Sequence, residues 1–431
     1  MNAAQHDSQS SQRLKIAFLD YPDVFEDFYS HYGVDHQTFA TKWHNTGSHA
    51  WLKIIQQEIG DVTWYALSIK PTLTVASTHE YIKANVKFLP SSWLHRRLWK
   101  LFYVSKFSWR LKKYYKTYAA LAAYTAPLSW KVFSEIKRDR PDVILVQEYS
   151  SGKFDVLCLY AKLLGLPLFT YHAGSTENDY SGKFLRRFTI KKAAWIYASG
   201  VKELNRLEQD WKVASSRLNI IRPPIDLNIY KPMPREETCR EAGLKSTRRY
   251  WIFVGRLDDG IKRVSAIIKM FCKAAENHAD LDLLIVGVGN DEMKLKSLVL
   301  ENFSERVLFL GWVADDYKKA VLYNCSECLL MASVREGFPT VIGEAFACGV
   351  PAVCSDVGTI ADLVIPGKTG WLFAANDDAA MLAIYKSIAE NADELFSIRS
   401  SLREVAEKNV SFEATALALK EGFEKVMGKK K

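Results

Sequence analysis

Two glutamates, Glu336 and Glu344, stand eight positions apart in the segment ASVREGFPTVIGEAFACGVPAV (332–353). An apolar run that ends near Ser333 predicts a strand before them, and Pro339 suits the first turn of a helix after that strand. We therefore expect Glu336 in a loop at the carboxyl end of a strand, and Glu344 just over one turn into the following helix.

A helix start between two carboxylates suits a sugar that is joined to a nucleoside through a diphosphate. The free N–H groups of a helix start attract anions, and a carboxylate accepts two hydrogen bonds from a vicinal diol. On this interpretation one glutamate binds sugar hydroxyls and the other binds the ribose, and the assignment to test is Glu336 for the sugar and Glu344 for the ribose. The simpler alternative is a charge at a helix terminus and a solvated surface glutamate, because such pairs often arise by chance.

Two cations, Arg256 and Lys262, follow another apolar run, YWIFVG (250–255). Positive charges at the carboxyl end of a strand would offset the charge that grows on a diphosphate leaving group, which stabilises a transition state without a metal ion. Two unrelated surface cations are the alternative. Asp258 and Asp259, beside them, fit a turn before a helix better than they fit a metal site.

Short apolar runs alternate with helical patterns in two series along the chain. Such runs are typical of parallel strands that helices cover on both faces, with the helices as crossovers. The first series comprises residues 14–21, 61–68, 142–149, 167–173, 194–199 and 218–223, and the second comprises residues 250–255, 282–287, 307–311, 328–333 and 351–356.

The two series predict an α/β fold of two Rossmann-like domains, each with a doubly wound parallel sheet, that face each other across a cleft. A proline-rich segment, RPPIDLNIYKPMP (222–234), marks the seam. We expect an acceptor-binding domain over residues 13–225 and a donor-binding domain over 226–410. Residues 411–431 are expected to form a helix that crosses back to the first domain. Ligands of open parallel sheets bind beyond the carboxyl ends of the strands.

The second series resembles the donor domain of family 4 glycosyltransferases, which are retaining enzymes of the two-domain GT-B fold. The resemblance rests on the segment with the two glutamates and on four blocks in the family's order, FVGRLDDGIK (253–262), LLIVGVGND (283–291), LFLGWV (308–313) and VGTIADLVIPGKTGWLF (357–373). It implies a nucleotide-diphosphate sugar as donor substrate, with no cofactor and no metal ion. The donor-binding residues that it implies are Arg256, Lys262, Gly287, Val313, Glu336, Gly337, Phe338, Pro339 and Glu344.

Around the cations the chain departs from the family's usual motif. One more residue separates Arg256 from Lys262, and Arg263 replaces the usual glycine. Lys262 remains the expected phosphate-binding residue, with Arg263 as a residue that could share the role. The resemblance implies catalytic roles for Arg256, Lys262, Glu336 and, in the first domain, His172, which follows an apolar run like the family's strand-end histidine near the reacting sugar.

The start of the first domain departs further. The family often has glycines directly after the first strand, where this chain has an insertion-like segment, residues 22–44, which would shape the acceptor site. A helix near Ser48 is expected to be the first crossover. The loop NTGS (45–48) is then the replacement for the glycines, and its Gly47 would permit close approach of the backbone to a phosphate.

Two segments of the first domain are rich in cations and aromatic residues. Residues 91–118 contain eight lysines and arginines, nine aromatic residues and no acid, with leucines at helical spacing, and residues 183–192 are also basic. Basic amphipathic helices with interfacial aromatic residues suit an anionic membrane surface. A core-facing helix with a solvated basic side is the alternative, and no motif supports nucleic acid.

The composition sets wider bounds on function. The chain is 48% hydrophobic and 25% charged, as globular proteins are, and its net charge of +9 permits anionic membranes or phosphate-bearing substrates without choosing between them. Residues 1–13 lack the apolar core of a signal peptide, and no uncharged apolar run reaches the length of a spanning helix. Cys325 and Cys328 have no second cysteine pair nearby, so we expect them to pack rather than bind metal, in a reducing cytoplasm.

The resemblance implies a retaining, metal-independent hexosyltransferase that acts on a hydroxyl acceptor in polysaccharide or glycolipid biosynthesis. A lipid-linked acceptor at the cytoplasmic membrane face fits the basic segments. One alternative is a nucleotide-sugar epimerase or hydrolase of the GT-B fold, which needs no acceptor. Another is a non-catalytic membrane scaffold. The sequence names neither the base, nor the sugar, nor the acceptor.

Overall fold

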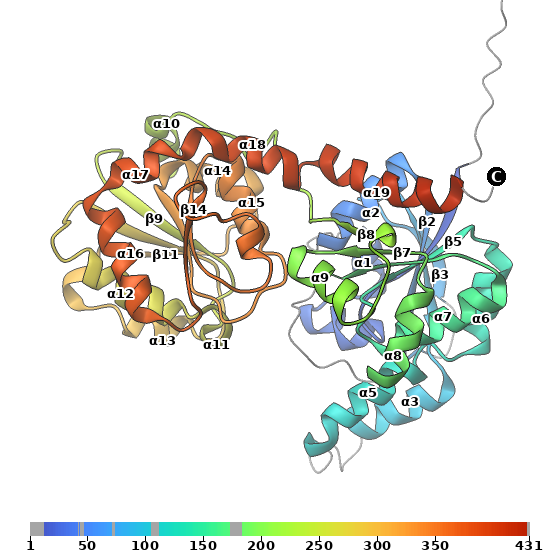
Figure 1. Cartoon of the computed structure of the whole chain (residues 1–431). Coiled ribbons are helices and arrows are strands. Elements are labelled where there is room, and N and C mark those ends of the chain that lie inside the picture. Colours follow the sequence, from blue (N-terminus) through green and yellow to red (C-terminus); the bar gives the residue numbers. More distant parts are fainter. Residues whose placement is uncertain are drawn as a thin grey trace, which may run out of the picture.

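The computed structural model of the 431-residue chain describes residues 13–41, 43, 47–70, 74–104, 112–172 and 183–428. The strands form two sheets, one in each of two lobes that lie side by side (Figure 1). Among the described residues, no helix combines the length and the apolar composition needed to cross a bilayer.

The N-terminal lobe is built on an eight-stranded sheet with the order β3-β4-β2-β1-β5-β6-β7-β8. Neighbouring strands are parallel, except that β3 pairs antiparallel with β4 at one edge. Every residue of β5 is buried, as expected of a central strand covered on both faces. The strands are β1 (Leu14–Leu19), β2 (Gly60–Ser68), β3 (Thr74–Thr78), β4 (Asn85–Pro90), β5 (Val143–Gln147), β6 (Leu168–His172), β7 (Trp195–Ala198) and β8 (Leu218–Ile220).

Helices connect these strands and cover the sheet (Figure 1). The predicted first crossover is confirmed, because α2 begins at Gly47 and leads into β2. It buries Trp51, whose ring meets the ring of Phe18 edge-on at 5.5 Å. The helices of this lobe are α1 (His36–Thr41), α2 (Gly47–Glu58), α3 (Trp93–Trp99), α5 (Tyr115–Thr125), α6 (Trp130–Asp139), α7 (Gly152–Leu164), α8 (Lys183–Thr189) and α9 (Val201–Gln209).

The basic segment 91–118 is described in two parts, since residues 105–111 lie outside the described residues. α3 ends at Trp99 and a π-helical turn (Lys100–Val104) extends it, and α5 begins at Tyr115. α3 and α5 pack against each other and protrude from the lobe (Figure 1). The segment 22–44 contributes to the core, since Phe25 and Phe39 are fully buried there.

The C-terminal lobe has a six-stranded parallel sheet with the order β11-β10-β9-β12-β13-β14. Cys325 and Cys328 are both buried, one at a helix end and one at a strand start, as predicted. The strands are β9 (Arg249–Val254), β10 (Leu281–Val286), β11 (Val307–Gly311), β12 (Cys328–Met331), β13 (Ala352–Ser355) and β14 (Gly370–Phe373). The helices are α10 (Arg235–Glu241), α11 (Asp259–Lys262), α12 (Val264–Ala274), α13 (Glu292–Ser297), α14 (Asp316–Cys325), α15 (Thr340–Ala347), α16 (Asp378–Glu390), α17 (Ala392–Ser397) and α18 (Arg399–Val410).

The carboxyl edges of the two sheets face each other. Asp362, in the turn after β13, accepts a hydrogen bond from the backbone N–H of Val201, directly after β7, at 2.9 Å. It also pairs with Arg222 at 3.3 Å, and Lys202 pairs with Asp356 at 3.1 Å. The loops that extend from the carboxyl ends of both sheets therefore meet at the lobe interface.

The last helix, α19 (Phe412–Met427), reaches back to the N-terminal lobe along the top of the molecule (Figure 1). The hydroxyl of Tyr197 donates to the carbonyl of Leu419 at 2.8 Å, and the rings of Phe169 and Phe423 stack with their centroids 4.5 Å apart. Ser411 caps the helix by accepting a hydrogen bond from the N–H of Ala414 at 2.9 Å. The chain thus passes between the lobes twice.

Candidate active site

A cavity of about 930 Å³ opens at the carboxyl ends of β9, β10 and β11. The loops after these strands form its walls, and α14 and α15 contribute one residue each. The lining residues are Val254, Gly255, Arg256 and Asp258 after β9; Val286, Gly287, Val288, Gly289, Asn290 and Asp291 after β10; Trp312 and Val313 after β11; and Lys319 and Thr340 from the helices. The fold therefore brings three predicted donor-binding residues together: Arg256, Gly287 and Val313.

Gly287 allows two of these loops to touch. Its φ is +137°, and a Cβ atom at this position would lie only 1.9 Å from the carbonyl oxygen of Gly255. A side chain would push the loops after β9 and β10 apart, so the shape of this wall depends on the glycine.

Arg256 is weakly held. Its side chain is 60% exposed, and its nearest carboxylate, Asp258, lies 3.6 Å away. Exposed ion pairs of this kind contribute little to stability. An anionic ligand in the cavity can therefore recruit the guanidinium without breaking a strong interaction.

The predicted phosphate-binding and sugar-binding residues, Lys262 and Glu336, are in direct contact. The Nζ atom of Lys262 donates to Oε1 of Glu336 at 2.5 Å, and the two side chains are only 19% and 10% exposed. The pair joins the end of α11 to the loop after β12. The cation that we expect to bind phosphate and the carboxylate that we expect to bind sugar hydroxyls thus lie in contact.

A turn after β13 holds the loop that carries Glu336. Gly358, with a φ of +59°, approaches so closely that a Cβ atom there would lie 2.1 Å from the carbonyl oxygen of Glu336. The hydroxyl of the next residue, Thr359, donates to the carbonyl of Gly337 at 2.8 Å. The backbone on both sides of the Glu336–Gly337 peptide is therefore fixed by close contact.

Phe338 and Pro339 lead from this loop into α15. Pro339 immediately precedes the helix in an extended conformation, and the guanidinium of Arg222 lies 5.9 Å from the ring centroid of Phe338. Because Thr340 lines the cavity, the first turn of α15 meets it. The N–H groups of a helix start favour an anion at this position.

Glu344 is buried, and it reaches the cavity through Lys319. Oε2 of Glu344 accepts a hydrogen bond from the hydroxyl of Tyr323 at 2.9 Å, and Oε1 lies 3.7 Å from Nζ of Lys319. Lys319 also pairs with Asp316 at 2.8 Å, and Asp316 accepts a hydrogen bond from the hydroxyl of Tyr230 at 2.9 Å. These five residues form one polar network, the Lys319 network.

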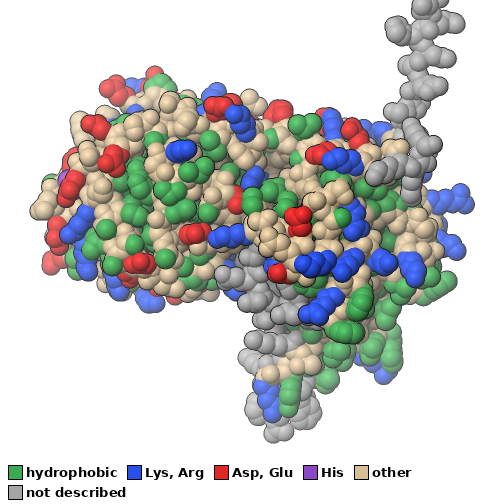
Figure 2. All heavy atoms as spheres, in the orientation of Figure 1, with side chains coloured by type: hydrophobic (Ala, Val, Ile, Leu, Met, Phe, Trp, Pro, Cys, Tyr) green, Lys and Arg blue, Asp and Glu red, His purple; other side chains and the backbone are tan. Residues whose placement is uncertain are grey.

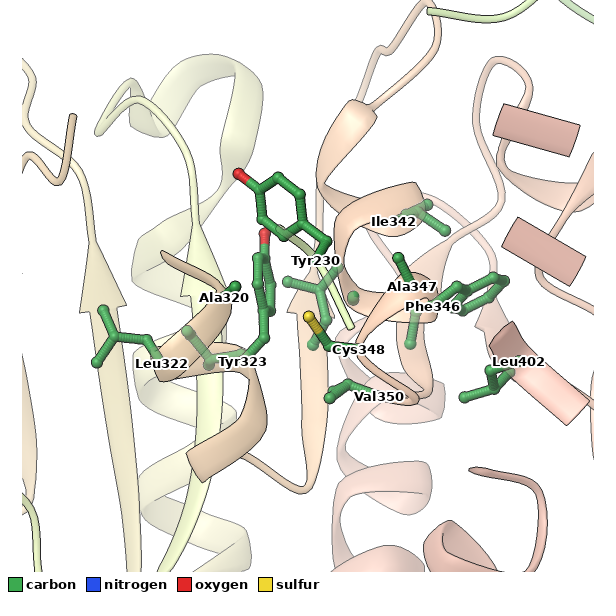
Figure 3. Close-up of a cluster of buried hydrophobic side chains, with 14 of the residues drawn as sticks. Tyr230, Ala320, Leu322, Tyr323, Ile342, Phe346, Ala347, Cys348, Val350 and Leu402 are labelled. Atoms are coloured by element: carbon green, nitrogen blue, oxygen red, sulfur yellow. The ribbon is translucent and has the colours of Figure 1, made fainter. Parts of the chain in front are cut away.

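The Lys319 network rests on the hydrophobic core of the lobe. Figure 3 shows the rings of Tyr230 and Tyr323 side by side in this core, with both hydroxyl groups on the same side of the cluster. Burial raises the pKa of Glu344, and the charge of Lys319 and the hydroxyl of Tyr323 oppose that rise. Burial lowers the pKa of Lys319, but Glu344 and Asp316 raise it overall. The ionised form of Glu344 therefore depends on Lys319.

His172 ends β6 in the N-terminal lobe and is held by Glu148. Its Nδ1 lies 2.5 Å from Oε2 of Glu148, and its ring centroid lies 4.8 Å from that of Tyr149. A carboxylate at Nδ1 places the proton there, so Nε2 is the atom left for a ligand. Nε2 is buried and has no hydrogen-bond partner in the described part of the chain. Glu148 adopts a φ of +70°, which is uncommon for a residue with a side chain.

Three other residues had predicted roles near the site, namely Gly47, Arg263 and Asp259. Gly47 is the first residue of α2, but the loop before it, residues 44–46, lies outside the described residues. Arg263 does not join Lys262, because its guanidinium pairs with Asp378 at 2.6 Å and ties α12 to α16. The carboxylate of Asp259 accepts a hydrogen bond from the N–H of Ser265 at 2.8 Å, as a turn before a helix does.

Sequence reasoning missed Glu148 and Lys319. Glu148 follows an apolar strand directly, as His172 does, so its position at a strand end was a usable signal. Lys319 and Tyr323 are one helical turn apart on α14, and this spacing predicts a shared face but not the glutamate that they meet.

Comparison with known proteins bears on the family and the fold of the chain. Residues 234–409 match the family model of the group 1 glycosyl transferases. The chain is 29% identical over 204 residues to the N-acetyl-alpha-D-glucosaminyl L-malate synthase of Bacillus anthracis. This match covers 46% of this chain and 51% of that protein. It is 30% identical over 217 residues, 50% of this chain and 56% of the relative, to the N-acetylgalactosamine-N,N'-diacetylbacillosaminyl-diphospho-undecaprenol 4-alpha-N-acetylgalactosaminyltransferase of Campylobacter jejuni. The matches thus span about half the length of these relatives.

A solved structure extends the likeness to both lobes. The HepE protein of Anabaena, solved in complex with UDP, superposes with a TM-score of 0.70 over 96% of this chain and 100% of that chain, at 16% identity. At this identity the match establishes the fold alone. The predicted two-domain architecture is confirmed. The chain has the GT-B fold, and its residues 234–409 form a group 1 glycosyltransferase domain.

Proposed function

We propose that the chain is a retaining hexosyltransferase that moves a sugar from a nucleotide-diphosphate donor to a hydroxyl acceptor. The observation that carries the proposal is the cavity that Arg256 and Thr340 line at the carboxyl ends of β9, β10 and β11, in the lobe that also holds the Lys262–Glu336 contact. Arg256 and the start of α15 meet the cavity, and the same lobe holds the Lys262–Glu336 pair, so cations, helix N–H groups and a carboxylate are available, which are the groups that a diphosphate and a sugar require.

In this proposal the diphosphate lies at the start of α15 between Arg256 and Lys262, and Glu336 accepts hydrogen bonds from the sugar. The negative charge on the leaving phosphate grows as the glycosidic bond breaks, and the two cations stabilise it without a metal ion. Departure and attack occur on the same face. The leaving phosphate takes the proton of the acceptor hydroxyl, so the product keeps the anomeric configuration of the donor.

The N-terminal lobe supplies the acceptor side. Nε2 of His172, oriented by Glu148, is the proposed contact to the reacting sugar, and Gly47 at the start of α2 is a proposed phosphate neighbour. We propose a lipid-linked acceptor at the cytoplasmic face of a membrane, in polysaccharide or glycolipid synthesis. The Campylobacter relative supports this choice, because its name specifies a glycosylated diphospho-undecaprenol.

The test is a panel of nucleotide sugars in a thermal-stability assay, with UDP-sugars first because the HepE structure contains UDP. A donor present at 100 times its dissociation constant should stabilise the folded protein by about 2.7 kcal/mol. The stabilising donor is then incubated with candidate hydroxyl acceptors in the presence of a chelator. NMR should show a product with the donor's anomeric configuration. An inverted product, or turnover that needs no acceptor, would contradict the proposal, and the latter would favour an epimerase or hydrolase.

A further inference from the structure

Helix α8 exposes its apolar side and buries a cation. Phe184 is 78% exposed and Phe188 is 59% exposed, and Leu185 between them is 44% exposed, whereas Arg186 is completely buried. A helix on the surface of a globular protein normally does the opposite. The apolar side of α8 is therefore turned outward by the way the helix is fixed to the lobe.

A buried ion pair fixes α8. The guanidinium of Arg186 donates to Oδ2 of Asp155 on α7 at 2.9 Å and to the carbonyl of Ser151 at 2.6 Å, and it lies 5.2 Å from the ring centroid of Phe154. The hydroxyl of Thr189, one turn later, donates to the other oxygen of Asp155. Rotating the helix to bury its phenylalanines would leave Asp155 without its cation, which is costly in a buried site.

The same aspartate brings α5 beside α8. The hydroxyl of Tyr124 on α5 donates to Oδ2 of Asp155 at 2.8 Å, so α5 and α8 both pack on α7. α5 adds Leu121, which is 50% exposed. Figure 2 shows basic and hydrophobic side chains gathered over the lower part of the N-terminal lobe, where Figure 1 places these helices.

Cations accompany these apolar residues along the sequence. Arg187, Lys191 and Lys192 are exposed beside the phenylalanines, and residues 183–192 contain no acid. The protruding α3 and α5 belong to a stretch, residues 81–134, with eleven lysines and arginines and no acid. We call the exposed apolar residues of α8, Leu121 and these three cations the α8 face. Apolar anchors inside a cationic rim complement an anionic bilayer, in which the rings enter the interface and the cations meet the headgroups.

We propose that the α8 face docks the protein on an anionic lipid bilayer, with Phe184 and Phe188 inserted at the headgroup level. The bilayer is then the membrane partner in the proposed function. Only the lipid-linked acceptor rests on that proposed function, because binding to a bilayer does not require sugar transfer. Docking through the N-terminal lobe leaves the donor cavity of the C-terminal lobe open to soluble nucleotide sugar.

Flotation of the full chain with vesicles tests this inference. The wild-type protein should float with phosphatidylcholine vesicles that contain phosphatidylglycerol, should not float with phosphatidylcholine alone, and should be released near 1 M salt, where screening shortens to about 3 Å. Phe184→Ser/Phe188→Ser should lower the vesicle partition coefficient by at least about 10-fold. Arg187→Gln/Lys191→Gln/Lys192→Gln should lower it about 100-fold, since each cation is worth about fivefold.

A matched control replaces two equally exposed apolar residues on other helices, Met293→Ser and Leu417→Ser, which are 79% and 72% exposed. These variants should float like the wild type. Failure of the wild type to bind anionic vesicles, or equal loss in control and α8 variants, would overturn the inference. So would a concentration-dependent dimer, seen by sedimentation, that only the phenylalanine variant abolishes. Nucleotide-sugar stabilisation is measured on every variant, because its absence throughout would refute the proposed function while leaving vesicle binding intact.

Discussion

Replacing Lys319 by methionine should destabilise the C-terminal lobe in a pH-dependent way. At 3.7 Å, the attraction between Lys319 and Glu344 amounts to about 4 kcal/mol with an effective dielectric constant of about 20. Breaking a buried pair by removing one partner costs about 3–5 kcal/mol. Asp316, the other partner of Lys319, has a side chain that is 53% exposed and remains hydrated. We therefore expect a loss of about 2–4 kcal/mol in the free energy of unfolding near pH 8.

The sign of the pH dependence follows from Glu344. Burial raises its pKa in the folded protein above the ordinary value of 4.5, so the folded state binds the proton more tightly than the unfolded state. Stability then falls as the pH rises from 4.5 through the folded-state pKa. Without Lys319 that pKa rises further, and the fall becomes larger. Below pH 4.5 Glu344 is protonated in both states and needs no cation, so the loss should shrink to roughly 1 kcal/mol.

Urea unfolding at both pH values measures the effect. The double variant Lys319→Met/Glu344→Gln should regain most of the stability at pH 8, because it carries no buried charge that lacks a partner. Lys318→Met, at an exposed neighbour on the same helix, serves as the matched control and should change little. An equal loss at the two pH values, or a double variant as unstable as Lys319→Met, would show that Lys319 does not act by keeping Glu344 ionised.

Three further predictions concern ligand binding and turnover. Arg256→Ala should weaken nucleoside diphosphate binding and slow transfer about 100-fold, the scale of losing one charge-stabilising donor, and unchanged kinetics would remove Arg256 from the site. Calorimetry should show that Glu336→Gln spares the affinity for free nucleotide and lowers the affinity for the sugar nucleotide, whereas Glu344→Gln should lower both affinities. The same pattern in the two variants would refute this division of roles. Glu148→Gln should lower kcat about 10-fold or more with little change in donor affinity, because it frees the orientation of His172, and an unaffected kcat would exclude that positioning role.

The strands that sequence reasoning located and those that it missed differ in burial. β9 and β10 each contain a run of at least four buried apolar residues because helices cover both faces of their sheet, so their residue types alone predict them. β3 and β4 lie at the edge of the other sheet, where β4 alternates buried and partly exposed positions and includes Lys87. An edge strand needs fewer apolar residues, and its pattern is correspondingly weak.

Some residues of the candidate site could likewise be predicted from the sequence, whereas their contacts could not. Arg256, Glu336 and His172 stand next to strand ends, and strand ends can be located from the sequence. The contact of Lys262 with Glu336 joins residues that are 74 positions apart, and it requires the actual register of α11 against the loop after β12. Arg263 was a reasonable alternative to Lys262 by position, but its partner is Asp378 on a helix that folds onto it from the far end of the lobe. Pairings of this kind are set by tertiary packing rather than by local spacing.

The two passages of the chain between the lobes lie against each other. The N–H of Ile225 donates to the carbonyl of Val410 at 2.7 Å, and the hydroxyl of Thr415 donates to the carbonyl of Arg222 at 3.2 Å. The two segments that connect the lobes, hydrogen-bonded to each other over a short distance, form a hinge. Rotation about this hinge would keep these two hydrogen bonds, whereas sliding one lobe past the other would break them. Opening of the lobes should first break the Lys202–Asp356 ion pair, whose side chains are 51% and 45% exposed. Substrates would then enter on the side opposite the two chain passages, which keep the lobes aligned.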